Sequence, residues 1–469
     1  MRRASRVLAF VAAASAVSSA ACFHSSLDFG PAPSQTPTPP ASPTPTSTPT
    51  GGLDFGDGAD GDLDVSTDVL PNVCHGLVSA SGTSATVTTS GGFTAGRRVL
   101  FLQVQDAVTA PLGDGSPVTN FGSAGLFEIR RVTALTPTTL TLGSALTNSY
   151  ATLGAKTAEV CSLPEFAAVH VLSAGKLHAP NWDGSVGGVL AFFAQSLQID
   201  AGAGGPGGGG FLSATGRGFR GGQLAPPFTV DHYTMLDVAL TDGSGGGKGE
   251  GLDATSWTRA ARGNLANGAG GGNGNAAGGG GGGAAGAGGS GSSEYVNVAG
   301  GVNTNTRGMP GASIVVPSGT ARLLMGGAGG AGQHDTGTQG AGGGGGGVIW
   351  LSTGALSGAG SIRASGFFGQ RSTSSGGGGG GGAGGTVVVI TGDSTGFTGA
   401  VDASGGNGGD SQTQDGPGGG GAGGWIYYSG MPSGFTYSLA GGTPGTETAV
   451  TNSPRDATAG QDGHSAPVP

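Results

Sequence analysis

The sequence predicts an all-β chain, in which a small antiparallel β-domain precedes a glycine-rich β-solenoid or sandwich that carries a candidate polyglycine II layer. Short β-branched segments recur between turn residues, and no segment combines helix caps with a 3.6-residue period. Glycine accounts for 107 of the 469 residues; 19 precede residue 186, so 107 − 19 = 88 lie in the remainder. There the glycines alternate with β-segments that resemble one another, which indicates stacked coils.

The N-terminus predicts an export signal over residues 1–21. Basic residues are followed by an apolar run at 7–17, too short to span a membrane, and by small residues at 18–21. Small residues before Cys22 resemble the lipobox of bacterial lipoproteins, although Ser19 stands where Leu or Val is usual. We expect lipidation at Cys22 and anchoring at the outer membrane or cell surface. The alternative is a secreted protein cleaved nearby.

Residues 22–52 comprise this cysteine and a linker, whose stretch 31–50 contains mainly Pro, Thr and Ser. Such composition favours extended polyproline II and therefore a spacer. Three of the 19 basic residues lie in the leader, which leaves 16 against 28 acidic residues, a net charge of about −12. We expect no nucleic-acid partner, since a basic patch is needed to bind phosphates.

Residues 53–165 predict the antiparallel β-domain. Alternating apolar segments lie at 83–89, 99–104, 127–132 and 138–142. Cys74 and Cys161 are the two cysteines that remain in an oxidising compartment, so the simplest pairing is a disulfide that closes this domain. Two free buried thiols are the alternative.

Residues 166–445 predict the repeats, and 446–469 a C-terminal tail. Double glycines at 187, 346, 384 and 423 each precede an apolar segment, and the last three starts lie 38 and 39 residues apart. Two positions of each segment are always large and apolar, so they should face inward. The first holds Leu190, Ile349, Val387 and Ile426; the second holds Phe192, Leu351, Val389 and Tyr428.

The longest glycine runs are at 278–283, 342–347 and 376–382. Without a Cβ, such runs can pack as three-fold helices whose backbones bond to one another. The alternative is disordered loops between the coils.

Several motifs of the repeat region resemble a group of glycine-rich bacterial surface lipoproteins that are labelled PE-PGRS-like for their composition. These motifs are residues 182–184 (Trp-Asp-Gly), 187–192 and 216–222, and residues 54–62 resemble the start of the mature domain in that group. The resemblance covers about residues 53–430 and implies a fold more than an activity. More distantly, the glycine runs are similar to polyglycine sandwiches of adhesin domains, which are binding surfaces.

Two groups of residues are candidate sites. Asp54, Asp57, Asp60 and Asp62 lie among glycines and could supply oxygen ligands to Ca²⁺, although their spacing does not fit an EF-hand. Asp-Gly turns are the alternative, and no other cofactor is expected. Trp350, Trp425 and Tyr427 occupy the variable face of the repeats and could form a platform for glycans. Packing beneath the glycine segments is the alternative.

These features together predict a non-enzymatic surface lipoprotein with a structural or adhesive role. Its expected partners are the membrane, which it contacts through the lipid, and glycans or other surface proteins. One alternative is a polysaccharide-acting solenoid enzyme, which requires recurring carboxylates on one face. The only recurrent charged position offers Asp200, Arg363 and Asp402. A ligand-free surface-coat protein is the other alternative.

Overall fold

The computed structural model describes residues 53–468 except 107–112, 114, 153–155, 203–208, 225–234, 243–244, 275, 294–305, 335–337, 413–414, 433–434 and 449–453. The predicted signal peptide, Cys22 and the linker lie outside the described residues. In the described part, the fold is all-β as predicted, and its only helical elements are 3-10 turns at Leu240–Asp242 and Ser256–Thr258. None of these described helices could cross a membrane.

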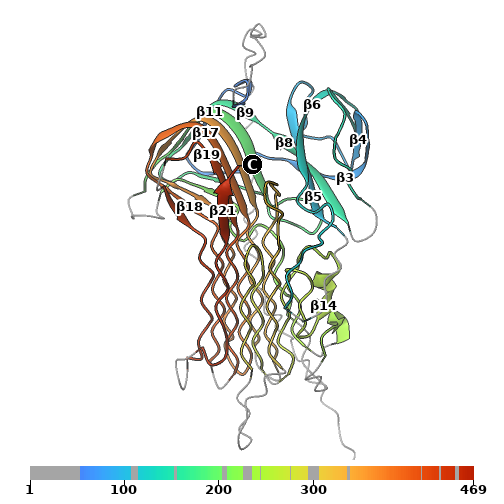
Figure 1. Cartoon of the computed structure of the whole chain (residues 1–469), viewed down its shortest axis with the longest axis vertical. Coiled ribbons are helices and arrows are strands. Elements are labelled where there is room, and N and C mark those ends of the chain that lie inside the picture. Colours follow the sequence, from blue (N-terminus) through green and yellow to red (C-terminus); the bar gives the residue numbers. More distant parts are fainter. Residues whose placement is uncertain are drawn as a thin grey trace, which may run out of the picture. The chain divides into compact units, whose positions relative to one another are not determined.

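Six antiparallel strands form a closed barrel in the order β3-β4-β7-β6-β5-β8 (Figure 1). All four segments predicted for the β-domain are strands here, and the other two strands carry the cysteines. The disulfide is confirmed: Cys74 and Cys161 are opposite each other on β3 and β8, and they close a separation of 87 residues. On the chain-entropy account, a loop of that length stabilises the fold by about 4–5 kcal/mol. The strands are β3 (Cys74–Ser81), β4 (Ser84–Val87), β5 (Arg98–Gln105), β6 (Phe127–Leu135), β7 (Thr139–Leu142) and β8 (Thr157–Leu163).

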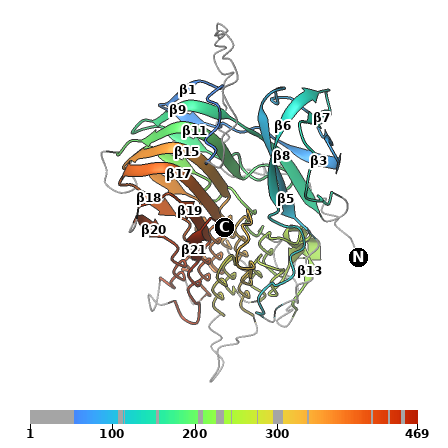
Figure 2. The same cartoon turned by 45° about the horizontal axis from the view of Figure 1, so that its top comes forward.

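The repeats form a parallel solenoid of two sheets, whose strands stack in coil order (Figure 2). The long sheet contains β1 (Asp62–Val65), β9 (Glu165–Val171), β11 (Val189–Ile199), β15 (Val348–Gly358), β17 (Thr386–Phe397), β19 (Trp425–Ser429) and β21 (His464–Pro467). The short sheet contains β2 (Asp68–Val69), β10 (Lys176–His178), β12 (Phe211–Ser213), β16 (Ser361–Arg363), β18 (Ala400–Asp402) and β20 (Thr436–Ser438). A separate antiparallel pair joins β13 (Val238–Ala239) to β14 (Arg259–Ala260).

The predicted register of the repeats is confirmed. Leu190, Ile349, Val387 and Ile426 are hydrogen-bonded neighbours across the long sheet and are fully buried. Their side chains pack against those of the short sheet, such as Ile362, to form the solenoid core. This core explains why these positions are apolar in every repeat, because the inward-facing side chains must fill the space between the two sheets in each coil.

Two domain boundaries differ from the prediction. Strands β1 and β2 pair with β9 and β10, so residues 62–69 belong to the solenoid and the barrel is inserted between its first two coils. The predicted tail 446–469 contributes β21, which pairs with β19 at the edge of the long sheet. Parallel strands require partners that are distant in the sequence, and such pairings leave no local signal.

The glycine runs are ordered, as the polyglycine II prediction required. Within Gly278–Gly283, successive amides donate to three different segments in rotation: Gly278 and Gly281 to residues 292 and 289, Gly279 and Gly282 to 378 and 381, Gly280 and Gly283 to 270 and 267. The carbonyls of the same run accept, again in rotation, from segments at 308–311, 419–422 and 327–330. Three donor directions and three acceptor directions give the run six neighbours. This three-residue rotation is that of a polyglycine II helix.

The same helices extend the coils of the solenoid from β12 onward, and we call the whole assembly the glycine bundle (Figure 1). One glycine arm leaves a short-sheet strand, and a second arm returns into the next long-sheet strand, as residues 376–385 return into β17. Returning arms bond to one another: Gly381 donates to the Gly419 carbonyl, 38 positions later. The 38- and 39-residue spacing therefore reflects one coil of the solenoid with its two arms.

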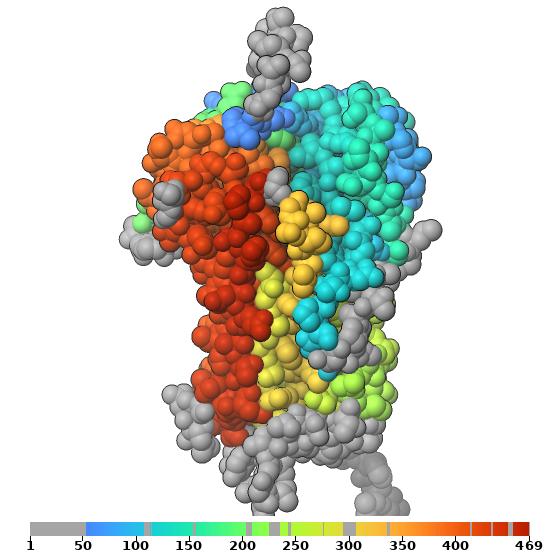
Figure 3. Space-filling model, viewed as in Figure 1, coloured from blue at the N-terminus to red at the C-terminus, as the bar shows by residue number. Residues whose placement is uncertain are grey.

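Glycine is required in the bundle because neighbouring backbones occupy the space of a side chain. A Cβ added at Gly280 would lie 2.1 Å from the Met309 carbonyl oxygen, and one at Gly380 would lie 1.8 Å from that of Gly280. Larger residues lie three positions apart on the arm that follows β18. Asn407 and Asp410, three residues apart, accept through their side chains from the backbone amides of Thr443 and Thr446 at 3.0 and 2.8 Å. On the surface, C-terminal segments lie beside segments from residues near 290 (Figure 3).

Two adjacent glycines provide a matched test of this packing. The Gly345→Ala substitution would place a Cβ 1.8 Å from the Gly326 carbonyl oxygen, whereas at Gly344 the nearest atom is 3.1 Å away. We expect Gly345→Ala to lower the free energy of unfolding by about 1–3 kcal/mol. Gly344→Ala should change it by less than about 1 kcal/mol, since alanine also restricts the unfolded chain. Equilibrium urea unfolding measures both, and equal effects would contradict a close-packed bundle.

Candidate functional site

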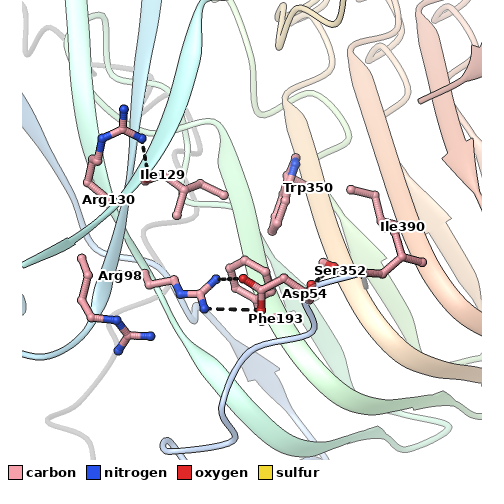
Figure 4. Close-up of a pocket in the computed structure, with 10 residues that line it drawn as sticks. Asp54, Arg98, Ile129, Arg130, Phe193, Trp350, Ser352 and Ile390 are labelled. Atoms are coloured by element: carbon pink, nitrogen blue, oxygen red, sulfur yellow. Dashed lines mark hydrogen bonds and ion pairs between the residues drawn. The ribbon is translucent and has the colours of Figure 1, made fainter. Parts of the chain in front are cut away.

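A cleft of about 510 Å³ lies between strands β5 and β6 of the barrel and the long sheet (Figure 4). It brings the first predicted aspartate together with one of the predicted aromatic residues. Apolar side chains from β6, β11, β15 and β17 line one part of the cleft and arginines from β5 and β6 line another. The lining residues are Leu53, Asp54, Arg98, Ile129, Arg130, Arg131, Phe193, Trp350, Ser352 and Ile390.

Arginines form ion pairs with three of the four aspartates in the predicted calcium cluster. Arg98 donates to both oxygens of Asp54, at 2.5 and 3.3 Å. Arg131 is 3.5 Å from Asp57, and Arg97 is 3.2 Å from Asp60. Asp62 is exposed on β1, and no ion pair to a described residue is seen there.

The pKa of Asp54 reflects this environment. Burial would raise it, but hydrogen bonds from Arg98 and from the Gly56 amide hold the pKa below its ordinary value. The structure thus places guanidinium groups where calcium would need to approach, and like charges repel. Calcium binding at the cluster stays a prediction that requires these ion pairs to open.

Glu165, at the start of β9, is the buried centre of the ionic network. Its side chain is fully buried, with Arg98 Nε at 3.3 Å and Arg131 Nη2 at 3.2 Å. It also accepts from the Asp57 amide at 3.1 Å. Burial raises the pKa of Glu165, and the two guanidinium groups oppose that effect. Because both arginines come from barrel strands and Glu165 from the solenoid, the network fastens the two together.

The aromatic residues do not form an exposed platform, which corrects the glycan-platform prediction. Trp350, Trp425 and Tyr427 are exposed by 5, 2 and 4%. They pack in a core with apolar side chains of the barrel and of residues 312–325. Trp350 meets Phe193 edge to face at 4.9 Å, and Arg98 lies 4.5 Å above the Phe193 ring. The variable face of the repeats varies in size because it packs against the barrel and residues 312–325, which do not repeat from coil to coil.

The three charged residues of the enzyme hypothesis are not aligned. Arg363 and Asp402 are neighbours on β16 and β18, but Asp200 follows β11 in the long sheet. The Asp200 carboxylate lies 3.0 Å from His170 Nε2. In the coil that contains Asp200, the strand equivalent to β16 is β12, which lies further along the chain than Asp200. The three charged residues therefore do not share a position on the repeats.

A buried clamp joins the motifs that carry the family resemblance. Glu250 accepts from Arg220 Nε at 2.8 Å, from the Arg220 amide at 2.9 Å and from Trp182 Nε1 at 3.1 Å. Arg220 also lies 3.7 Å above the Trp257 ring. Trp182 packs against Phe219, with ring centroids 6.2 Å apart. The motif residues therefore have a structural role between the first coils and the glycine bundle.

Lys248, two residues before that glutamate, is also fully buried. Its ammonium donates to the carbonyls of Leu236, Ala261 and Gly263, and Asp237 lies 3.8 Å away. Burial lowers the pKa of Lys248 to about 7. Sequence reasoning missed these buried groups, and the available signal was their isolation: in a chain with 10% charged residues, a single charge within an apolar or glycine segment indicates a specific partner.

Glu159 on β8 is a third buried acid, and it lies beside the disulfide. Its carboxylate accepts from the Gly187 amide at 2.7 Å, which links the barrel to the start of β11. Burial raises the pKa of Glu159 to about 8. In the described part of the chain, Cys74, Glu159 and Cys161 are the one set of three ligand-type side chains close enough to share an ion. The two sulfurs are bonded to each other, so they are not available as thiolates.

The Glu165 network predicts an asymmetric response to substitution. Glu165→Ala removes the buried partner of Arg98 and Arg131, which keep their contacts to Asp54 and Asp57, so we expect the free energy of unfolding to fall by about 1–3 kcal/mol. Asp57→Ala removes a half-exposed carboxylate and should cost less than about 1 kcal/mol. Urea unfolding of both variants measures the difference. A small loss for Glu165→Ala would show that the network is not a fastening.

The raised pKa of Glu159 predicts a pH dependence. The folded protein holds this proton more tightly than the unfolded chain, whose value is near 4.5. Stabilisation is therefore complete below pH 4.5 and is lost as the pH rises through about 8. Glu159→Gln keeps the acceptor for the Gly187 amide but cannot ionise. The urea midpoint of wild type should fall relative to that of the variant from pH 5 to 8, and parallel curves would contradict the assignment.

Comparison of the chain with protein-family models, with curated proteins and with solved structures finds no match. The resemblance to glycine-rich surface lipoproteins and to polyglycine adhesin domains therefore stays a prediction, and the residues themselves carry the functional argument.

Proposed function

We propose that the protein is an exported, non-enzymatic lipoprotein that has an adhesive or structural role at the cell surface. The observation that carries the proposal is that the buried charged groups bind other parts of the fold. Glu165 and Glu250 are bonded to arginines and Lys248 to carbonyls, all in contacts that fasten one part of the fold to another. An active site needs such groups to face a substrate, whereas a scaffold needs them as fastenings.

The glycine bundle supports the same role. Its helices are held laterally by backbone hydrogen bonds in up to six directions, which makes a stiff extension of the solenoid. A stiff body on a Pro/Thr/Ser tether, anchored through a lipidated Cys22, would present its surfaces away from the membrane. Glycans or other surface proteins are the proposed partners.

Expression of the full chain in a bacterium tests this function. Cells that carry the chain should bind to surfaces coated with polysaccharides or with extracellular proteins more strongly than empty-vector cells. Labelled palmitate should enter the wild type and not the Cys22→Ala variant, which should also be lost from the membrane fraction. Release of reducing sugar ends from the coated polymers would instead support the polysaccharide-acting enzyme. Absence of binding to every surface would support the ligand-free coat protein.

A further inference from the structure

The outer face of the short sheet carries a groove of about 660 Å³ over strands β16, β18 and β20. The middle residues of the first two strands, Ile362 and Val401, are fully buried in the solenoid core. Because side chains alternate along a strand, the residues on either side of them face outward. The lining of the groove includes Gly360, Gly399 and Ala400, whose small size leaves room above the strands. We call this the short-sheet groove.

Arg363 and Asp402 are the two charged residues of the groove, and they are in-register neighbours on β16 and β18. The Arg363 guanidinium is 5.6 Å from the centre of the Phe211 ring, which lies on the adjoining strand β12. Among the described residues, no hydrogen bond or ion pair engages this guanidinium. Asp402 Oδ1 accepts from the Ser404 amide at 2.9 Å, and Oδ2 has no described donor. The groove thus offers both donors and a strong acceptor.

Hydroxyl groups extend this polar surface across the sheet. Thr436 and Ser438 also line the groove, on β20, whereas Ser361 on β16 is 7% exposed. Successive strands of a sheet are about 4.8 Å apart, close to the length of one sugar ring in an extended chain. One positive and one negative charge offset each other, so the groove favours a ligand that has hydroxyl groups and no net charge.

We propose that the short-sheet groove binds a neutral polysaccharide chain that runs across β16, β18 and β20. Arg363 donates to sugar hydroxyls and Asp402 accepts from them, while the serine and threonine hydroxyls contact the neighbouring ring. The proposal rests on the adhesive function proposed above, and it names the ligand class and the site.

Binding of the detergent-purified full chain to immobilised neutral glucan, mannan and xylan oligosaccharides tests the proposal, with polygalacturonate as an acidic comparison. We expect binding to at least one neutral series, weakened about tenfold or more by Arg363→Gln and by Asp402→Asn. Arg371→Gln, at an exposed arginine on the glycine arm beyond β16, is the matched control and should bind like wild type. Thermal unfolding checks that each variant folds. Ser438→Ala gives a milder probe of the same groove.

The outcomes separate this site from the general function. Neutral-glycan binding that both Arg363→Gln and Asp402→Asn leave intact would overturn the site while retaining the adhesive role. Binding to polygalacturonate alone would overturn the ligand class. Cell attachment to protein-coated surfaces without any glycan binding would overturn the groove proposal only, whereas loss of all attachment would overturn the function on which it rests.

Discussion

Backbone hydrogen bonds between glycine helices are the interaction on which the rest of this structure depends. Fixing the backbone of a residue costs about 1–2 kcal/mol of conformational free energy, and glycine has the most freedom to lose. Each helix recovers this cost only if its amides and carbonyls find partners on every side. Gly278–Gly283 does so with six neighbours. A side chain in its interior would overlap a carbonyl, as the 2.1 Å separation at Gly280 shows.

The solenoid explains how such a bundle can form from one chain. Each arm begins or ends in a strand whose register is fixed by buried apolar side chains, so the arms arrive already aligned with those of the next coil. Ile349 and Val387, for example, are paired in the long sheet, and the arms that precede them bond between Gly346 and Ala383. The solenoid core therefore supplies the alignment, and the glycine bundle extends it without further side chains.

Charged residues determine how the barrel, and the stretch between β12 and β15 that contains Glu250, attach to this framework. Glu165 holds two barrel arginines, Glu159 holds the start of β11, and Glu250 holds Arg220. These contacts are few and buried, and each joins two segments that are distant in the sequence. Arg363 and Asp402 differ from these buried charged residues, because they face outward in the short-sheet groove and do not join two parts of the fold.

The sequence predicted the parts of the fold that depend on local pattern. The double-glycine starts and the apolar row at Leu190 and Ile349 gave the long-sheet strands with their register, and cysteine counting gave the disulfide. The assignment of β1 and β21 to the solenoid could not be predicted, because their partners are distant in the chain. The aromatic platform was wrong because alternation shows which face Trp350 occupies, and not what covers that face. The three-residue spacing of Asn407 and Asp410 was a signal in the sequence that indicated helices at the edge of the bundle.

The central claim is that the glycine runs are hydrogen-bonded helices, and amide hydrogen exchange of the full chain with isotopically labelled glycine tests it most directly. The account predicts that amides of Gly278–Gly283 and Gly377–Gly382 exchange as slowly as those of the long-sheet strands, because each donates to a neighbouring carbonyl. Exchange of these amides at the rate of an unstructured chain, with the strands still protected, would contradict it.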